Sequence, residues 1–209
     1  FWCTASNNSS SGPHIGGFNT ITRGSGITLW AAMPQMEAGA FPTSYIPTSG
    51  STATRTADVA SLPLERFAYN DTKGSIVVSA RPLQVGDPSG SQALLEIGTA
   101  NRSKIYLFAR LAGTSQSRFL AKDGSTQADL KSSDFVGGSL SKMSAGWAVN
   151  NFAMSMDGGA AVVDTAGAVM TGCTIMGIGT LAMPSTNLIN GYIKQIQYFP
   201  KRLSNEELE

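Results

Sequence analysis

The sequence predicts an all-β protein built as an antiparallel β-sandwich, and three observations support this prediction. Only 14% of the 209 residues are charged, 23 are glycine, and Ser and Thr are abundant throughout. Short β-branched or aromatic runs recur at the spacing typical of a sandwich. Turn residues separate these runs, as at Asp123-Gly124 and Asp157-Gly158, where glycine readily accepts a positive φ. A chain of this length can bury a sizeable core without disulfides.

The expected strands end at residues that cannot continue a ladder. Residues 74–82 form a β-branched run closed by Pro82, and residues 189–199 form a strand with one bulge that stops at Pro200. Ser204 and Glu207 then make a Ser-x-x-Glu capping box, which predicts a short C-terminal helix. The other expected strands are 15–21, 27–33, 93–98, 104–111, 118–122, 143–147, 151–156, 160–164 and 174–178.

The charge balance argues against two classes of partner. Fifteen basic and 14 acidic residues give a net charge of +1, and no basic run exceeds two residues. Phosphate binding needs clustered Lys and Arg, so we expect no nucleic-acid partner. No apolar stretch approaches the roughly 20 residues that span a bilayer, so we expect no membrane insertion. Cys3 and Cys173 fit no zinc or redox spacing, and we expect no cofactor.

The end of the chain carries a resemblance to a known superfamily. From Gly191 to Glu209 it resembles the C-terminal signature of concanavalin A-like lectin/glucanase domains, especially laminin-G-like jelly rolls. The chain departs from that signature at two positions, where Lys194 and Gln195 replace the usual acidic pair. The resemblance implies a concanavalin A-like jelly roll over residues 57–209. The matching residues are Gly191, Ile193, Ile196, Tyr198, Arg202, Leu203, Ser204 and Glu207.

Residues 34–56 are interpreted as an ordered Pro/Thr-rich connector, because three prolines favour an extended path over a helix. The connector resembles one found in tail-fibre proteins of tailed bacteriophages and prophages, where it links an upstream β module to a lectin-like one. Residues 1–33 would then be the remnant of such a module, or a stand-in for it. The matching residues are Gln35, Glu37, Gly39, Thr43, Ser44, Tyr45, Ile46, Pro47, Thr48, Thr54, Arg55 and Asp58.

Catalytic patterns are weak in this sequence. His14 is the single imidazole and lies in a Gly/Ser/Asn-rich stretch, so nucleophilic triads and zinc sites are poor interpretations. Glu96 is the nearest match to a glucanase carboxylate, but no acidic residue lies two or three positions away. We therefore expect no catalytic residues and no metal ligands. Calcium remains open through loop aspartates that are better explained as turn formers: Asp71, Asp87, Asp123 and Asp157.

Sugar recognition needs an aromatic platform together with planar polar side chains. Tyr106, Phe108 and Arg110 share one face of a strand by alternation, and we expect the face bearing Arg110 to be open. Trp147 and Asn150 near a strand-to-strand loop form a second candidate. The predicted carbohydrate-binding residues are thus Trp147, Tyr106, Arg110 and Asn150. The alternative is that Trp147 packs under the loop and Tyr106 has no binding role.

Together these patterns favour a tail-fibre-like receptor-binding module of a phage or prophage, acting in the virion or at the host surface. The module would attach without enzymatic activity to a bacterial cell-surface glycan. The resemblance also implies a homotrimer and contacts with other virion tail proteins. Two alternatives stay open: a structural or trimerisation module without a ligand, and a glycan-cleaving tailspike fragment.

Overall fold

The computed structural model describes residues 2–4, 35–37, 45–54, 60–83, 91–99, 103–110, 113–179, 189 and 191–209. The chain divides into two compact units, Phe1–Thr56 and Ala57–Glu209. In the first unit, β1 (Trp2–Thr4) pairs in parallel with β2 (Gln35–Glu37). Residues 45–54 of the connector are described and contain no helix or strand. The expected strands 15–21 and 27–33, and His14, lie outside the described residues.

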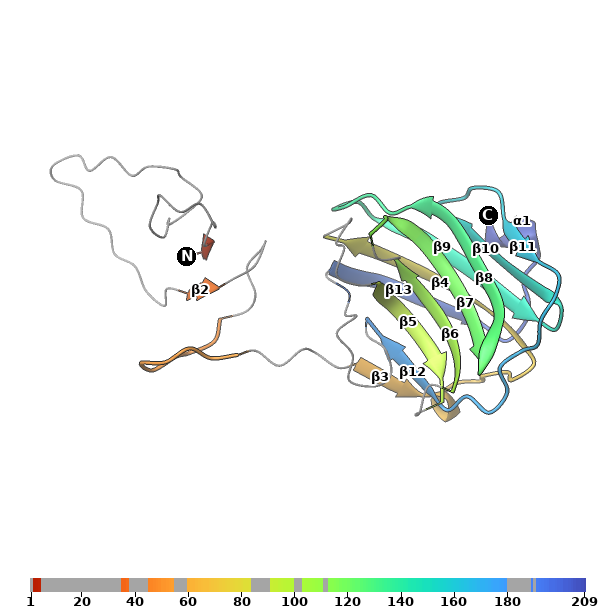
Figure 1. Ribbon diagram of the computed structural model, residues 1–209, viewed down its shortest axis with the longest axis horizontal. Helices are drawn as coiled ribbons and strands as arrows, with labels where there is room; N and C mark the ends of the chain where they lie inside the picture. Colours follow the sequence, from red (N-terminus) through yellow and green to blue (C-terminus); the bar gives the residue numbers. More distant parts are fainter. Residues whose placement is uncertain are drawn as a thin grey trace, which may run out of the picture. The chain divides into compact units, whose positions relative to one another are not determined.

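The second unit consists of two antiparallel sheets layered over one another (Figure 1). The five-stranded sheet has the order β11 (Val162–Asp164), β10 (Asn151–Met156), β9 (Ser141–Ala148), β4 (Lys73–Pro82), β13 (Gly191–Phe199). The six-stranded sheet has the order β3 (Ala60–Pro63), β12 (Ile175–Ile178), β5 (Gln92–Gly98), β6 (Lys104–Arg110), β7 (Gln116–Asp123), β8 (Ser125–Asp134). The predicted antiparallel β-sandwich is confirmed.

The core lies between the two sheets and is rich in aromatic side chains. The indole of Trp147 on β9 packs against Tyr106 of β6, with ring centroids 4.6 Å apart. Gly74 of β4 stands opposite Trp147 in the register, and a Cβ at Gly74 would lie 2.5 Å from the Trp147 ring. A glycine is therefore required on β4 for the largest core side chain to fit.

The chain ends as predicted, with a bulged strand, a stop and a capped helix. The register of β13 against β4 shifts between Ile193 and Gln195, and the strand ends before Pro200. In α1 (Asn205–Leu208), the Glu207 N–H donates to Ser204 Oγ at 3.2 Å, and the Ser204 N–H donates to the Glu207 carboxylate at 2.7 Å. No helix in the described ranges is long and apolar enough to cross a membrane.

The helix covers part of the outer face of the five-stranded sheet. Leu203 and Leu208 pack on Ala153 of β10 and on Phe199. The Leu203 N–H donates to Ser75 Oγ at 2.9 Å, and Ser144 Oγ donates to the Leu208 carbonyl. These contacts hold the C-terminal segment over β4, β9 and β10. The helix does not cover the part of this face that lies beyond Ser79 along β4.

Four strands were not expected from the sequence: β1 and β2 in the first unit, and β3 and β8 in the second. β8 is largely polar, since of its ten residues only Ala128 and Leu130 are buried. β3 is a short edge strand that pairs with β12. Both lie at the two edges of the six-stranded sheet, where a strand has a single hydrogen-bonded neighbour in its sheet and a weaker apolar pattern.

Candidate functional site

Trp147 lies in the core, so its proposed role as a sugar platform was wrong. The indole is fully buried, with an exposed fraction of 0%. It contacts Tyr106, Phe108, Phe119 and Tyr198 at ring-centroid distances of 4.6 to 6.5 Å. The alternative weighed for Trp147, packing beneath the surface, is the observed one.

The expected open face of β6 is in fact the inner face. Tyr106 and Phe108 are both fully buried. The Met170 N–H donates to the Tyr106 hydroxyl oxygen at 2.8 Å, and burial raises the pKa of Tyr106 above its usual value. Arg110 belongs to β6, but its side chain lies outside the described part of the chain. Residues on both faces of β6 are apolar, which is why alternation alone could not identify the inner one.

Asn150 is exposed and shapes the turn between β9 and β10. It adopts a positive φ of 53°, its N–H donates to the Gly167 carbonyl at 3.0 Å, and its Oδ1 accepts from the Gly167 N–H at 3.1 Å. Asn tolerates this conformation better than most residues. With Trp147 buried beneath the sheet surface, the candidates from the sequence do not form one site.

Among the loop aspartates considered for calcium, Asp157 shapes a turn. Asp157 has a positive φ of 51°, and its Oδ1 accepts from the Lys142 N–H at 2.6 Å. Within the described ranges, no three His, Cys, Asp or Glu side chains come together as metal ligands. Asp87 lies outside those ranges.

Glu96 lies on the outer face of the six-stranded sheet, opposite to its neighbours Leu95 and Ile97 in the core. The register runs from Glu96 through Leu107 and Leu120 to Asp129, which places the two carboxylate positions three strands apart. At a strand spacing of roughly 4.8 Å this is about 14 Å. Glycosidase carboxylates lie closer, at roughly 5 to 9.5 Å.

Asp129 is already engaged on that face. Its carboxylate accepts from Arg118 Nε at 2.7 Å and from Arg118 Nη2 at 3.0 Å, and Lys131 Nζ lies 3.8 Å away. This two-bond geometry fixes the carboxylate as an ion-pair partner. Glu96 and Asp129 therefore do not form a glycosidase pair with each other.

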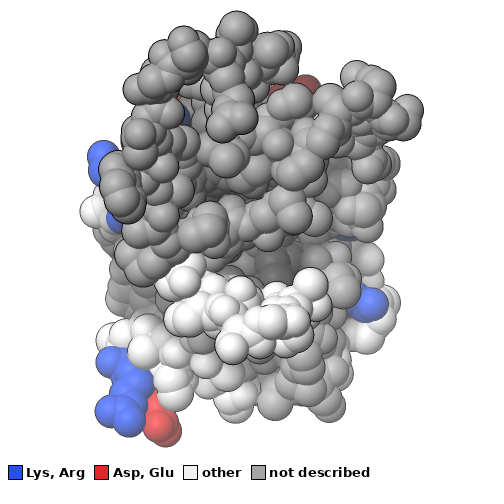
Figure 2. Space-filling view, turned by 90° about the vertical axis from the view of Figure 1, so that its left-hand side faces the viewer, with Lys and Arg blue, Asp and Glu red and all other residues white. Residues whose placement is uncertain are grey.

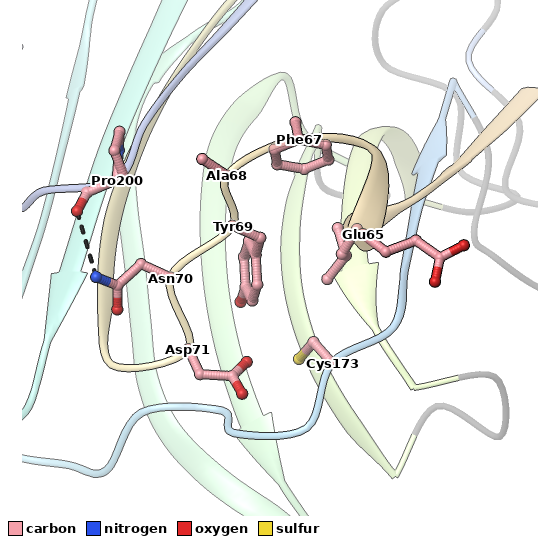
Figure 3. A pocket seen from close by; sticks show the side chains of 9 residues that line it. Glu65, Phe67, Ala68, Tyr69, Asn70, Asp71, Cys173 and Pro200 are labelled. Carbon is pink, nitrogen blue, oxygen red and sulfur yellow. Dashed lines mark hydrogen bonds between the residues drawn. The ribbon is translucent and has the colours of Figure 1, made fainter.

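An open pocket lies at one end of the sandwich, where segments distant in sequence meet (Figure 3). The 3₁₀ turn η1 (Leu64–Arg66) is tied to the segment before β12 by a Leu64 N–H that donates to the Thr174 carbonyl at 3.0 Å. The pocket has a volume of about 620 Å³. Its lining residues are Leu64, Glu65, Phe67, Ala68, Tyr69, Asn70, Asp71, Cys173 and Pro200.

Tyr69 is the central side chain of the pocket. Its ring stacks on Tyr198 at 5.8 Å and meets the edge of Phe67 at 6.2 Å. Its hydroxyl is buried without a hydrogen-bond partner among the described residues and points toward Asp71 and Cys173 (Figure 3). Burial raises the pKa of Tyr69 far above its usual value, and the nearby thiol and carboxylate add to this effect. The hydroxyl therefore stays protonated and can donate a hydrogen bond.

The remaining polar groups of the pocket are mostly acceptors. Asn70 Oδ1 accepts from the Thr72 N–H at 2.9 Å, and the Asn70 N–H donates to the Tyr198 hydroxyl at 2.8 Å, so the loop is held in place. The carboxylates of Asp71 and Glu65 belong to exposed residues, and the described residues of the lining include no Lys or Arg. The pocket thus combines a half-buried aromatic ring with acceptors suited to hydroxyl-bearing ligands.

Sequence reasoning missed this site because its parts are dispersed along the chain. Asp71 was considered only for calcium or a turn, and Phe67-Ala68-Tyr69-Asn70-Asp71 lies in a segment without strand periodicity. An aromatic residue followed by an amide and a carboxylate was the available local signal. On the surface shown in Figure 2, Lys and Arg side chains of the described residues lie apart from one another, without a basic patch on that face.

Comparison with known proteins gives the class of fold. No model of a known protein family matches the sequence, and no curated protein matches it. Domains LG4-5 of the mouse laminin α1 chain match with a TM-score of 0.52 at 15% identity, over 71% of this chain and 40% of that one. The Ruminococcus gnavus IT-sialidase CBM40 gives 0.55 at 17% identity, over 66% of this chain and 82% of that one.

A third match is the leech intramolecular trans-sialidase, with a TM-score of 0.56 at 17% identity, over 74% of this chain and 26% of that one. The chain spans less than half the length of the laminin and leech structures. At these identities the likeness shows the fold: the sandwich is a concanavalin A-like jelly roll with a short C-terminal helix, as predicted. The tail-fibre resemblance stays a prediction.

Proposed function

We propose that the chain is a non-enzymatic glycan-binding module and that its ligand enters the Tyr69 pocket. The observation that carries this proposal is the buried Tyr69 hydroxyl, which has no hydrogen-bond partner in the described part of the chain and belongs to an open pocket lined by carboxylates. A buried donor that makes no hydrogen bond destabilises the protein, so a ligand acceptor at this point is favoured. The half-buried ring offers an apolar surface to one face of a sugar.

The lining selects among glycans by charge. Asp71 and Glu65 accept hydrogen bonds from hydroxyl groups, whereas they repel carboxylates and phosphates. We therefore expect a neutral, hydroxyl-rich segment of a glycan at this pocket. Glycan binding in general has support by analogy from two proteins of similar fold: the R. gnavus CBM40 is bound to α2,3-sialyllactose in one structure, and domain 4 of a Geobacillus stearothermophilus arabinanase is in complex with arabinotriose in another.

The biological setting we propose is attachment of a phage or prophage tail fibre to a bacterial cell-surface glycan. Its support is the connector, in which Tyr45-Ile46-Pro47-Thr48 and the preceding Gln and Glu match the pattern of tail-fibre proteins. In that setting the module works as a homotrimer in the virion, next to other tail proteins. Mass determination of the purified chain tests the oligomeric state.

The test is binding of the purified chain to a panel of bacterial polysaccharides, with product analysis of every glycan bound. Tyr69→Phe removes only the hydroxyl, and the loss of one hydrogen bond should weaken binding about fivefold. Asp71→Asn removes a charged acceptor and should weaken binding tenfold or more. Asp134→Asn makes the same charge change on β8, outside the pocket lining, and should leave affinity unchanged.

Three results would contradict the proposal. Equal affinity of the wild type, Tyr69→Phe and Asp71→Asn proteins would remove the pocket from the binding site. A stable trimer that binds no glycan on the panel would favour a structural module. Shortened glycan products would favour a tailspike hydrolase.

A further inference from the structure

A second polar surface lies on the outer face of the five-stranded sheet, on its edge strand β13 and the neighbouring β4. Ile76, Val78 and Ala80 of β4 point into the core, so the residues between them point outward. In the register, Tyr192 stands opposite Arg81, Gln195 opposite Ser79, and Gln197 opposite Val77. We call this surface the β4–β13 strip, defined by Arg81, Ser79, Tyr192, Gln195 and Gln197.

The strip presents an aromatic ring next to a cation. Tyr192 is 64% exposed, the largest exposed fraction among the big apolar side chains of the described residues. Directly opposed residues of an antiparallel pair have Cβ atoms roughly 5 Å apart, so the side chains of Arg81 and Tyr192 start from neighbouring positions on this face. Gln195 and Gln197 are also exposed and add planar amide groups along the same face.

Arg81 is oriented by the protein. Its Nε donates to the Gly138 carbonyl, and the Gly138 N–H donates to the Pro82 carbonyl at 2.7 Å. These two bonds hold the guanidinium against the loop before β9. Its Nη1 and Nη2 have no partner among the described residues, and they keep the paired donors that suit a carboxylate.

The charged side chains of β4 and β13 are all basic. Neither β4 nor β13 contains Asp or Glu, and exposed Lys194 occupies the bulge between Ile193 and Gln195. Farther across the sheet, Asp157 Oδ1 accepts from the Lys142 N–H and Glu209 Oε1 accepts from the Ala161 N–H.

The exposed positions from Tyr192 to Gln197 span roughly 15 Å, the length of an extended chain segment.

We propose that the β4–β13 strip binds an acidic polysaccharide, with Arg81 holding a uronate carboxylate and Tyr192 packing against a sugar ring. Charge complementarity identifies the occupant, because a neutral glycan would leave the oriented guanidinium without an anionic partner. The Tyr69 pocket has the opposite character, since its described lining includes the carboxylates of Glu65 and Asp71 and no Lys or Arg. The two surfaces therefore bind different ligands, and this proposal does not depend on the pocket.

The experiment measures binding of the full chain to a polyuronate and to the same polymer after reduction of its carboxyl groups. We expect saturable binding of the polyuronate that weakens as salt is added, and at least tenfold weaker binding of the reduced polymer. Arg81→Gln should weaken polyuronate binding about tenfold or more, and Tyr192→Ser several-fold. Lys122→Gln removes an exposed positive charge from β7 and should change nothing.

Tyr69→Phe separates the two sites. It should leave polyuronate affinity unchanged, whereas Arg81→Gln should leave binding of a neutral glycan unchanged. Wild-type affinity in both Arg81→Gln and Tyr192→Ser would overturn the proposal. Absence of polyuronate binding, or equal binding of the reduced polymer, would overturn it as well. Both variants at the strip change exposed side chains, so their melting temperatures should equal that of the wild type, which serves as the check that the fold is retained.

Discussion

At the scale of single residues, the hydroxyl groups of two tyrosines have different roles. The Tyr106 hydroxyl accepts from the Met170 N–H inside the core, whereas the Tyr69 hydroxyl is buried at the pocket and none of the described residues bonds to it. The same substitution to Phe therefore has different consequences at the two positions. At Tyr106 it leaves a buried N–H unsatisfied, and at Tyr69 it removes a donor that lacked an acceptor.

We predict that Tyr106→Phe lowers the free energy of unfolding by about 1 to 3 kcal/mol, since Met170 loses the acceptor of its buried N–H. Urea unfolding of the full chain measures this change. Tyr69→Phe serves as the matched control and should cost less than Tyr106→Phe. Glycan affinity should respond in the reverse order, and a stability loss of equal size in both variants would contradict these roles.

The residues of the candidate site show where sequence reasoning stops. Trp147 was correctly placed on a strand, but its burial depends on Gly74 of a strand more than 60 positions away in the chain. Tyr106 and Leu107 are neighbours on a strand and both have largely apolar side chains, so the sequence pattern did not identify the inner face. The pocket joins Tyr69, Cys173 and Pro200, which only the folded chain brings together.

At the scale of elements, local signals were the reliable ones. β13 ends at Phe199, just before Pro200, and α1 begins directly after its N-cap Ser204, as predicted, because a missing N–H and a capping box act within a few residues. β8 was missed because its outward residues are polar and only two of its side chains are buried. The strength of an element's own sequence signal thus decided whether it could be predicted.

We predict that Ser204→Ala lowers the free energy of unfolding by about 1 kcal/mol at neutral pH, because the first turn of α1 loses its cap. Ser139→Ala, at an exposed serine in the loop before β9, is the control and should stay within about 0.5 kcal/mol of the wild type. Urea unfolding of the full chain measures both. A Ser204→Ala protein as stable as the control would show that α1 contributes nothing to global stability.

The same cap has a pH dependence. The Ser204 N–H, and then Lys201, hold the pKa of Glu207 below its usual value. A carboxylate with a lowered folded-state pKa stabilises the fold above its unfolded pKa of about 4.3, and this stability is lost as the pH falls through the folded value. The difference in stability between wild type and Glu207→Gln should therefore be present at pH 7 and vanish in acid. A difference that persists at pH 2 would contradict this assignment.

At the scale of the whole molecule, composition predicted the class of fold because few charges and many turn residues leave little choice but a sandwich. The same composition could not predict the aromatic cluster that joins the sheets, in which Tyr69, Tyr106 and Tyr198 surround Trp147 and Phe67. Burial raises the pKa of all three tyrosines above the ordinary value. The free energy of unfolding of the sandwich should therefore fall at alkaline pH.

The raised pKa values decide whether stability rises or falls with pH. A tyrosine with a raised folded-state pKa stabilises the fold fully below its unfolded pKa of about 10, and this stability is lost as the pH rises toward the folded value. Each such tyrosine should steepen the loss by about 1.4 kcal/mol per pH unit above pH 10. Urea unfolding between pH 9 and pH 11 should show a shallower loss for Tyr69→Phe than for the wild type. Parallel pH profiles of the two proteins would contradict the prediction.

The alternation of β13 has a consequence for how this molecule can evolve. Ile193, Ile196 and Tyr198 pack against the core, while Tyr192, Gln195 and Gln197 are exposed on the other side. Selection for stability constrains the core-facing residues of β13, whereas it does not constrain the exposed ones. Variants of this strand can therefore acquire new ligand preferences while their scaffold stays constant, so homologues should diverge fastest at the outward positions.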